Sequence, residues 1–306
     1  MVRGRLFIFR ETAMTQHTIC AGSLELVVDA ARGGSVMAFR DDGFDLMRPW
    51  DGVSEDPRAY ASFPLVPFSG RIDHAKFRFG GKDYALAPNF PPEPHAIHGD
   101  GWTSPWTVVA ANPTSLELEL IRDVAGEPLR YRATQVFWLY PDRLEIAMSI
   151  TNRGPEAMPF GLGHHPYFGD RDQARLSAEV GGVWLPDDLN IPTKLEPVPV
   201  LWGFRLRRPV AELVLDHVFQ DWNGQALVEW PEAGRALEIT ADELYRHLVV
   251  YVPPGQDFFC VEPVSMIGNG FTLLTAGVEG TGVRVLGPGE SMHGSMTFRP
   301  EPSRSA

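Results

Sequence analysis

The chain has 306 residues, of which 44 % are hydrophobic and 22 % charged, a composition typical of a folded globular protein rather than a disordered one. Its 30 glycines and 27 prolines are poorly tolerated inside helices, which argues against a helical bundle or a coiled coil. Its net charge of −12 repels phosphate backbones and anionic lipids, so nucleic acids and membranes are poor candidate partners.

The N-terminal segment, residues 1–14, precedes the first regular pattern, and we expect it to be a poorly ordered extension with translation starting at Met1 or Met14. Its apolar run is too short for the core of a signal peptide, so the expected location is cytoplasmic. Two cysteines, Cys20 and Cys260, are too few for a disulfide framework, and we expect both to be reduced and buried.

Alternating polar and apolar residues predict β-strands along most of the chain. The first predicted strands cover residues 23–29 and 115–121, and residues 76–86 predict a hairpin with Gly80 and Gly81 in its turn. A second hairpin is predicted where Pro141-Asp142 separates two apolar runs at 134–140 and 143–150. Later strands are predicted at residues 175–180, 225–230, 236–240, 247–252, 258–262 and 291–298.

Helical patterns are short: no segment of 12 or more residues keeps a helical period, and the best candidate is the single turn Ala241–Tyr245. Strands at this spacing are typical of antiparallel sheets packed as a sandwich. No linker divides the chain, and the Pro-rich stretch Pro88–Pro94 lies beside a candidate site. We therefore expect residues 15–306 to form one all-β domain, a large antiparallel β-sandwich.

The familiar cofactor motifs are missing from the sequence. Pro166 stands where a dinucleotide fingerprint starting at residue 161 would need its third glycine. The histidine pairs His95/His98 and His164/His165 have no cysteine or carboxylate partner at the usual zinc spacing. We therefore expect no cofactor and no metal, with a metal-dependent, cupin-like β-sandwich enzyme as an alternative.

Two loops carry residue types that suit a hydroxylated ligand. Arg71 follows Gly70 and could donate a fixed fork of hydrogen bonds, although a surface salt bridge is the simpler interpretation. His98 lies in a Gly-rich loop before Trp102 and Trp106, where ring nitrogens could bind sugar hydroxyls and an indole could stack on sugar CH groups. The alternative is a loop whose tryptophans belong to the core.

Two further segments carry groups that could exchange protons. His164 and His165 are adjacent, so in an extended segment only one of them faces a given pocket. A histidine titrates near neutral pH, although a hydrogen-bonded core histidine is the alternative. Glu262 lies on an apolar strand, where burial would raise its pKa and a nearby cation would lower it again. A carboxylate in that setting favours a functional role.

Taken in order, these segments resemble the aldose 1-epimerase (galactose mutarotase) family. The similarity runs from about residue 22 to residue 298, and its motifs are Gly-Arg-Ile at 70–72, His-Gly at 98–99, His-Pro-Tyr-Phe at 165–168, Leu-Asp-His at 215–217 and Val-Glu-Pro at 261–263. The resemblance implies a galactose mutarotase-like β super-sandwich with a sugar cleft on one sheet. It also implies an enzyme that interconverts the α and β anomers of a free aldose without a cofactor.

The family motifs imply roles for particular residues. Glu262 would be the general base and His165 the general acid, while His98 would hydrogen-bond the sugar and help to polarise its ring oxygen. A carboxylate base and an imidazolium acid suit this ring opening, so turnover would start with Glu262 ionised and His165 protonated. The expected substrate-binding residues are Arg71, Asp216, Trp102 and Asn269.

The sequence also departs from the family pattern. Asp100 and Met266 occupy positions where other residues are usual and where contact with the sugar rim is expected, and the charge of Asp100 argues against a phosphorylated hexose. A hexose-6-phosphate epimerase remains an alternative because Arg205, Arg207 and Arg208 could supply a phosphate site. A non-catalytic sugar-binding or sensing protein is another, and the chain could be a monomer or a homodimer.

Overall fold

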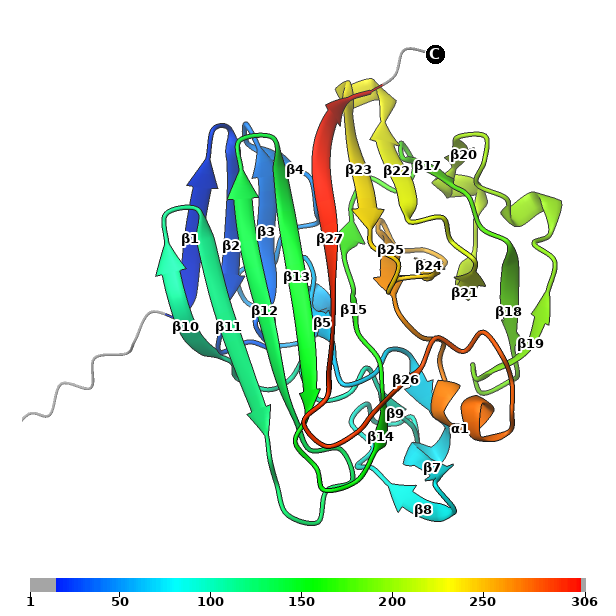
Figure 1. Ribbon diagram of the computed structural model, residues 1–306. Helices are drawn as coiled ribbons and strands as arrows, with labels where there is room; N and C mark the ends of the chain where they lie inside the picture. Colours follow the sequence, from blue (N-terminus) through cyan, green and yellow to red (C-terminus); the bar gives the residue numbers. More distant parts are fainter. Residues whose placement is uncertain (1–14, 304–306) are drawn as a thin grey trace, which may run out of the picture.

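Antiparallel sheets dominate the computed structural model, which describes residues 15–303 (Figure 1). This confirms the prediction of an all-β sandwich. The predicted N-terminal extension, residues 1–14, lies outside the described residues. Among the described residues no helix is long and apolar enough to span a membrane.

A four-stranded sheet from the start of the chain packs against the early strands of a nine-stranded sheet on the left of Figure 1, and the later strands of the nine-stranded sheet lie in the middle and on the right. The four-stranded sheet has the order β1 (Gln16–Ala21), β2 (Leu24–Asp29), β3 (Ser35–Asp41), β4 (Phe44–Asp45). The nine-stranded sheet has the order β10 (Thr107–Asn112), β11 (Ser115–Arg122), β12 (Tyr131–Tyr140), β13 (Arg143–Asn152), β27 (Ser291–Pro302), β23 (Arg235–Ala241), β22 (Gln225–Trp230), β17 (Arg175–Ala178), β20 (Arg208–Pro209). Its middle strand, β27, therefore joins early strands to late ones.

An eight-stranded sheet is the third large element. Its order is β19 (Pro192–Glu196), β18 (Gly182–Pro186), β21 (Leu215–Gln220), β24 (His247–Val252), β25 (Phe259–Val264), β15 (Gly163–His164), β5 (Pro64–Leu65), with β16 (Tyr167–Phe168) also paired to β25. Three two-stranded ribbons complete the strands: β6 (Arg71–Ile72) with β9 (Ala96–Ile97), β7 (Lys76–Phe79) with β8 (Lys82–Ala85), and β14 (Met158–Phe160) with β26 (Arg284–Leu286).

Short helices fill the connections between strands. The described α-helix is α1 (Gly270–Thr275), and the 3-10 turns are η1 (Pro57–Ala59), η2 (Asp73–Ala75), η3 (Val200–Trp202), η4 (Val210–Glu212) and η5 (Pro231–Ala233). The predicted helical turn at Ala241–Tyr245 is wrong. Ala241 ends β23, and the Asp242 carboxylate then accepts the backbone N–H groups of Leu244 and Ser295, which fixes a turn instead.

Both predicted hairpins are confirmed. Gly80 and Gly81 have φ values of 55° and 80° between β7 and β8, a backbone conformation that glycine adopts without strain. Pro141-Asp142 connects β12 to β13 in a ten-pair register. The prediction for the cysteines is half correct, because Cys260 is buried but Cys20 is exposed.

The eight-stranded sheet separates the main core from a cavity. On β25, Phe259 and Val261 pack into the main hydrophobic cluster, whereas Glu262 points to the opposite face. On the neighbouring β24, Leu248 and Val250 likewise face the core and Tyr251 faces the cavity. The core face is apolar and fixes the register, so the polar residues at alternate positions are held on the cavity face.

Candidate active site

A cavity of about 230 Å³ lies on the outer face of the eight-stranded sheet. It is the size of a small polar molecule, and its wall combines aromatic rings with charged side chains, as expected of a small-ligand site. Six of the seven residues predicted to form the site line it: Glu262, His165, His98, Arg71, Asp216 and Trp102. These residues come from separate strands and loops.

Glu262 and His165 face each other in the cavity wall. The distance between His165 Nε2 and Glu262 Oε1 is 3.3 Å, and the two residues are only 7 % and 2 % exposed. The position of His165 is fixed by its backbone N–H, which donates to the Phe63 carbonyl, and Glu262 lies opposite Val249 in the β24–β25 ladder. A proton can pass between these two groups or from either of them to a ligand.

The pKa shifts of this pair oppose the sequence expectation of an ionised Glu262 and a protonated His165. Burial raises the pKa of Glu262 well above its ordinary value, and the nearby Asp216 adds to the effect. Burial also lowers the pKa of His165 to about 3. Both shifts favour the uncharged forms, a protonated Glu262 and a neutral His165, because burial removes the hydration that stabilises each charge.

His98 is presented to the cavity by an unusual backbone. Its φ is 59°, and Gly99 follows with a φ of 69°, at a point where a Cβ would lie 2.2 Å from the Val66 carbonyl oxygen. The Gly70 N–H donates to His98 Nδ1 over 3.2 Å, so a neutral ring carries its proton on Nε2. Burial lowers the pKa of His98 well below its ordinary value, which makes it a neutral hydrogen-bond donor.

Asn89 and Trp102 hold the loop that carries His98. The Asn89 amide donates to the carbonyl oxygens of Ile97 and Gly99 over 2.8 and 2.6 Å and accepts the Ile97 N–H over 2.8 Å. Trp102 Nε1 donates to the same Gly99 carbonyl over 3.0 Å while its ring lines the cavity. The Pro-rich stretch that contains Asn89 is therefore a site loop, as predicted.

Arg71 lies between two carboxylates. Its Nε and NH2 atoms are 2.8 and 3.1 Å from the Glu93 oxygens, a bidentate pair, and its NH1 is 4.0 Å from Asp216 Oδ2. The guanidinium holds the pKa of Glu93 below its ordinary value. The Asn190 amide donates to Asp216 from the other side. These groups together present both donors and acceptors to a ligand.

His164 confirms that adjacent histidines face opposite sides of an extended segment. Its Nδ1 contacts Ser62 Oγ, and its Nε2 is 3.2 Å from Gln135 Oε1, inside the core. A neutral His164 can therefore donate from Nε2 to Gln135 Oε1 and accept the Ser62 hydroxyl at Nδ1. The Gln135 amide in turn donates to the Gly34 carbonyl. Its role is structural.

Several residues expected near the sugar lie elsewhere. Asn269 does not line the cavity; its backbone N–H binds the Arg71 carbonyl at the start of α1, so it supports Arg71 instead. Asp100 pairs with Tyr131 and Arg122 behind the His98 loop, because the positive φ at Gly99 turns the chain away. Met266 packs in the core.

The arginines considered for a phosphate site do not line the cavity. Each forms an ion pair with a glutamate, and the pairs are Arg205–Glu179, Arg207–Glu229 and Arg208–Glu212.

Several residues that line the cavity were not predicted as site residues from the sequence. None of them belongs to a predicted motif, although two lie in the Pro-rich stretch Pro88–Pro94. They are Arg58, Phe90, Glu93, Trp184, Asn190 and Tyr251.

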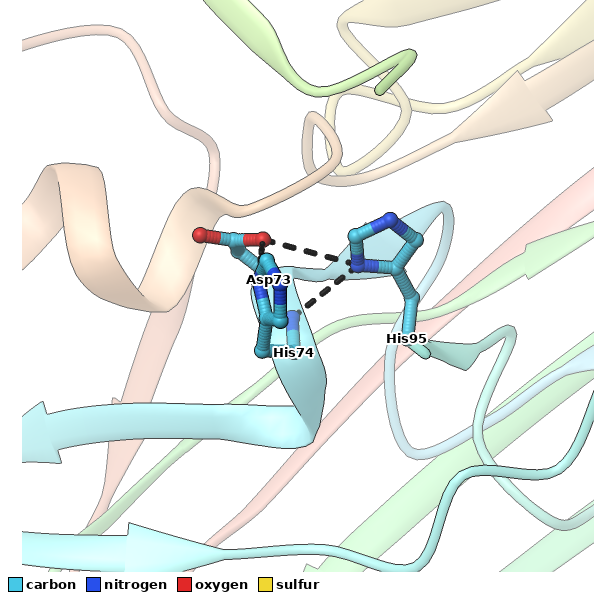
Figure 2. A group of neighbouring side chains, drawn as sticks. All are labelled: Asp73, His74 and His95. Atoms are coloured by element: carbon cyan, nitrogen blue, oxygen red, sulfur yellow. Dashed lines mark hydrogen bonds and ion pairs between the residues drawn. The ribbon is translucent and has the colours of Figure 1, made fainter. Parts of the chain in front are cut away.

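The cluster of Asp73, His74 and His95 has the composition of a metal site (Figure 2). Asp73 Oδ1 lies 2.6 Å from His74 Nδ1 and 3.5 Å from His95 Nδ1. However, the lone pair of His95 Nδ1 already accepts the His74 backbone N–H over 3.0 Å. Since this atom cannot also bind a metal, we assign no metal ligands here. His98 lines the cavity whereas His95 does not, so this histidine pair does not share one site.

Cys260 adds a thiol beside the acid–base pair. Its sulfur and one atom each of His165 and Glu262 lie within 4.8 Å of one another. Burial raises the pKa of this thiol well above its ordinary value, so it is protonated and non-nucleophilic at neutral pH.

Comparison with known proteins agrees with this architecture. The family model for aldose 1-epimerase matches residues 15–299. The chain is 35 % identical over 298 residues to "Uncharacterized protein YphB" of Escherichia coli (strain K12), covering 94 % of this chain and 99 % of that protein.

Solved structures give the same result. A "Putative aldose 1-epimerase" of Escherichia coli K12 superposes with a TM-score of 0.87 at 33 % identity, covering 94 % of this chain and 99 % of that one. A galactose mutarotase-like protein from Clostridium acetobutylicum, at 22 % identity and TM-score 0.80, covers 93 % of this chain and 94 % of that one and shows the shared fold. The chain belongs to the aldose 1-epimerase family and has the galactose mutarotase-like fold.

Proposed function

We propose that this protein is a cofactor-independent aldose 1-epimerase that interconverts the α and β anomers of a neutral free aldose. The observation that carries the proposal is the buried contact of 3.3 Å between His165 and Glu262 on the wall of a sugar-sized cavity. A protein that only bound or sensed a sugar would not need a buried proton-sharing pair, which is costly to maintain.

The reaction needs one proton acceptor and one proton donor. The base takes the proton from the hydroxyl on C1, a carbonyl forms at C1 as the C1–O5 bond breaks, and the acid protonates O5. The open aldehyde rotates about its C1–C2 bond, and ring closure reverses each transfer. The electrons stay within the sugar, so no oxidant or reductant takes part.

The pair supplies one donor and one acceptor whichever partner holds the proton. Transfer from Glu262 to His165 across their contact generates the carboxylate base and the imidazolium acid that the family motif implies. In this proposal His98, with its proton on Nε2, donates to the sugar and helps to polarise the ring oxygen. Each positioned proton transfer typically contributes about 10²–10⁴-fold to the rate.

The charges of the cavity favour an uncharged sugar. Arg71 is held by Glu93 and Asp216, and Arg58 is bound by Asp56 over 2.9 Å, so neither cation is free for a phosphate. The aromatic rings of the wall suit the CH faces of a sugar. These observations argue against the alternative of a hexose-6-phosphate epimerase.

Polarimetry or NMR on freshly dissolved α-anomers of glucose, galactose, xylose and arabinose tests the proposal, with glucose 6-phosphate as a comparison. We expect acceleration of at least one neutral aldose and a loss of about 10²–10⁴-fold in Glu262→Gln. Glu229→Gln, which alters a buried glutamate outside the cavity, is the matched control and should keep the rate. Acceleration of none of these sugars would refute the proposal.

Chelation tests the cofactor independence separately. Dialysis of the purified protein against EDTA should leave the rate unchanged. A loss of activity that Zn²⁺ restores would instead assign a metal to Cys260, His165 and Glu262.

A further inference from the structure

Arg48 carries a positive charge that is neutralised by no carboxylate within ion-pair distance among residues 15–303. Its guanidinium donates instead to two neutral acceptors, the carbonyl oxygens of Arg58 and Tyr60. An arginine does not lose its proton inside a protein, so the charge is permanent. A partly buried, unpaired cation calls for an explanation in terms of its neighbours.

The neighbours of Arg48 are aromatic. Its guanidinium carbon lies 4.4 Å from the centre of the Tyr167 ring and 4.4 Å from that of Phe258. Its backbone N–H also donates to the Tyr167 carbonyl over 2.8 Å. Cation–π attraction and a main-chain hydrogen bond therefore fix Arg48 and Tyr167 relative to each other.

Tyr167 connects this cation to the acid–base pair. The Tyr167 and His165 rings are stacked, with centroids 4.7 Å apart and planes inclined by 14°. Phe63 packs against the same imidazole with a centroid distance of 4.6 Å. The two ring spacings place the guanidinium carbon within about 9 Å of His165, close enough for a Coulombic effect in a protein interior.

We propose that Arg48 is a positioning residue for the proposed epimerase reaction, acting through Tyr167 to orient His165 and to bias the shared proton toward Glu262. The geometry supports both parts, because the stack restricts rotation of the imidazole and the fixed charge disfavours an imidazolium. Burial is the main cause of the low pKa of His165, about 3, and Arg48 acts in the same direction.

Other ionisable groups also surround His165, and Arg48 is the one among them with a permanent charge. The groups that face His165 or contribute to its field are Glu262, Cys260, His98, His164, Tyr167 and Arg48. Tyr167 and Cys260 also feel Arg48, and their raised pKa values keep them neutral at neutral pH. A change in the charge of residue 48 therefore acts mainly on the proton shared by His165 and Glu262.

Charge and shape can be separated by two substitutions. Arg48→Met removes the charge and keeps an apolar side chain against the rings, whereas Arg48→Lys keeps the charge. A unit charge at about 9 Å shifts a pKa by about one unit at an effective dielectric constant near 20. We expect the acidic limb of the kcat–pH profile to move about one unit toward neutral pH in Arg48→Met, with little change in KM, and to stay in place in Arg48→Lys.

Arg143→Met is the matched control. Arg143 lies 4.0 Å from the centre of the Tyr140 ring at the β12–β13 turn, outside the cavity, so its removal should leave the profile unchanged. If Arg48→Met does not fold, Arg48→Gln makes the same comparison, because its amide can still donate to the carbonyl oxygens that Arg48 binds.

The nitrogen chemical shifts of the His165 ring provide a readout that needs no activity. They should show the same upward pKa change in Arg48→Met. Unchanged shifts and an unchanged acidic limb, or an equal fall of kcat in the Met and Lys variants, would mean that Arg48 only supports the fold. If the wild-type protein accelerates no aldose, the proposed function fails, but the NMR titration still decides the role of Arg48.

Discussion

Gly99 offers a test of how precisely the His98 loop must be placed. A Cβ at this position would lie 2.2 Å from the Val66 carbonyl oxygen, about 0.8 Å inside the 3.0 Å limit of real contacts, and 2.4 Å from Pro67 Cδ. Both obstacles belong to the neighbouring chain segment, which meets Gly99 in a parallel bridge at Val66. Gly99→Ala must therefore push the loop and His98 away from their present position.

The expected cost has two parts. A left-handed φ of 69° costs an alanine about 1–2 kcal/mol, and overpacking of this kind adds about 1–3 kcal/mol. We expect Gly99→Ala to lower the free energy of unfolding by about 2–5 kcal/mol. Because a displacement near 1 Å can cost about 10²-fold in rate, we also expect a fall of that size in kcat.

Gly255 supplies the control, since its φ is 71° and no atom lies within 4 Å of the Cβ that an alanine would add. Gly255→Ala should therefore lose only about 1–2 kcal/mol and keep the wild-type kcat. Urea unfolding and NMR measurement of anomer exchange give both quantities. Equal losses of stability in the two variants, together with an unchanged kcat in Gly99→Ala, would refute the reasoning.

Two further predictions concern pH. The His165–Glu262 pair holds one proton from the pKa of His165, about 3, up to the raised pKa of Glu262, so the enzymatic rate should stay level through pH 6.5, where an unperturbed histidine would titrate. The rate should fall below the pKa of His165, where both groups are protonated, and above the pKa of Glu262, where neither group is protonated. A decline centred at pH 6.5 would contradict the directions of the two pKa shifts. The second prediction concerns His164, whose pKa in the folded state is about 3. Below pH 6.5 the unfolded chain binds a proton at this residue that the folded chain does not bind, so the free energy of unfolding decreases as the pH is lowered. At pH 5 this loss is about 2 kcal/mol for one buried histidine, and His164→Asn should show a correspondingly smaller decrease in urea titrations at pH 8 and pH 5; identical decreases in both proteins would rule it out.

The sequence was most informative where local chemistry decides the structure. The glycine pair at 80–81 and Pro141-Asp142 dictate their turns through backbone preference alone, and both hairpins form as predicted. The prediction failed at Ala241–Tyr245, because a hydrogen bond from the Ser295 backbone, which is distant in sequence, stabilises the turn. Propensity cannot anticipate such a partner.

In the candidate site, too, features that depend on local motifs were predicted and features that depend on distant residues were not. His98, His165 and Glu262, which were chosen from their motifs, line one cavity as predicted. Glu93 could not be identified, because its importance lies in the guanidinium that it binds from another loop. The protonation of the pair could not be read from residue types either, since it depends on how completely the folded chain excludes water from Glu262 and His165.

The place of β27 in the nine-stranded sheet has a consequence during protein synthesis. This strand pairs with β13 on one side and β23 on the other, yet it follows both in the chain. While the ribosome is still making residues 291–302, β13 and β23 each present an unpaired edge, and such edges pair readily with other chains. The sheet can therefore close only after β27 has emerged, and until then the edges of β13 and β23 are open to pairing with other chains.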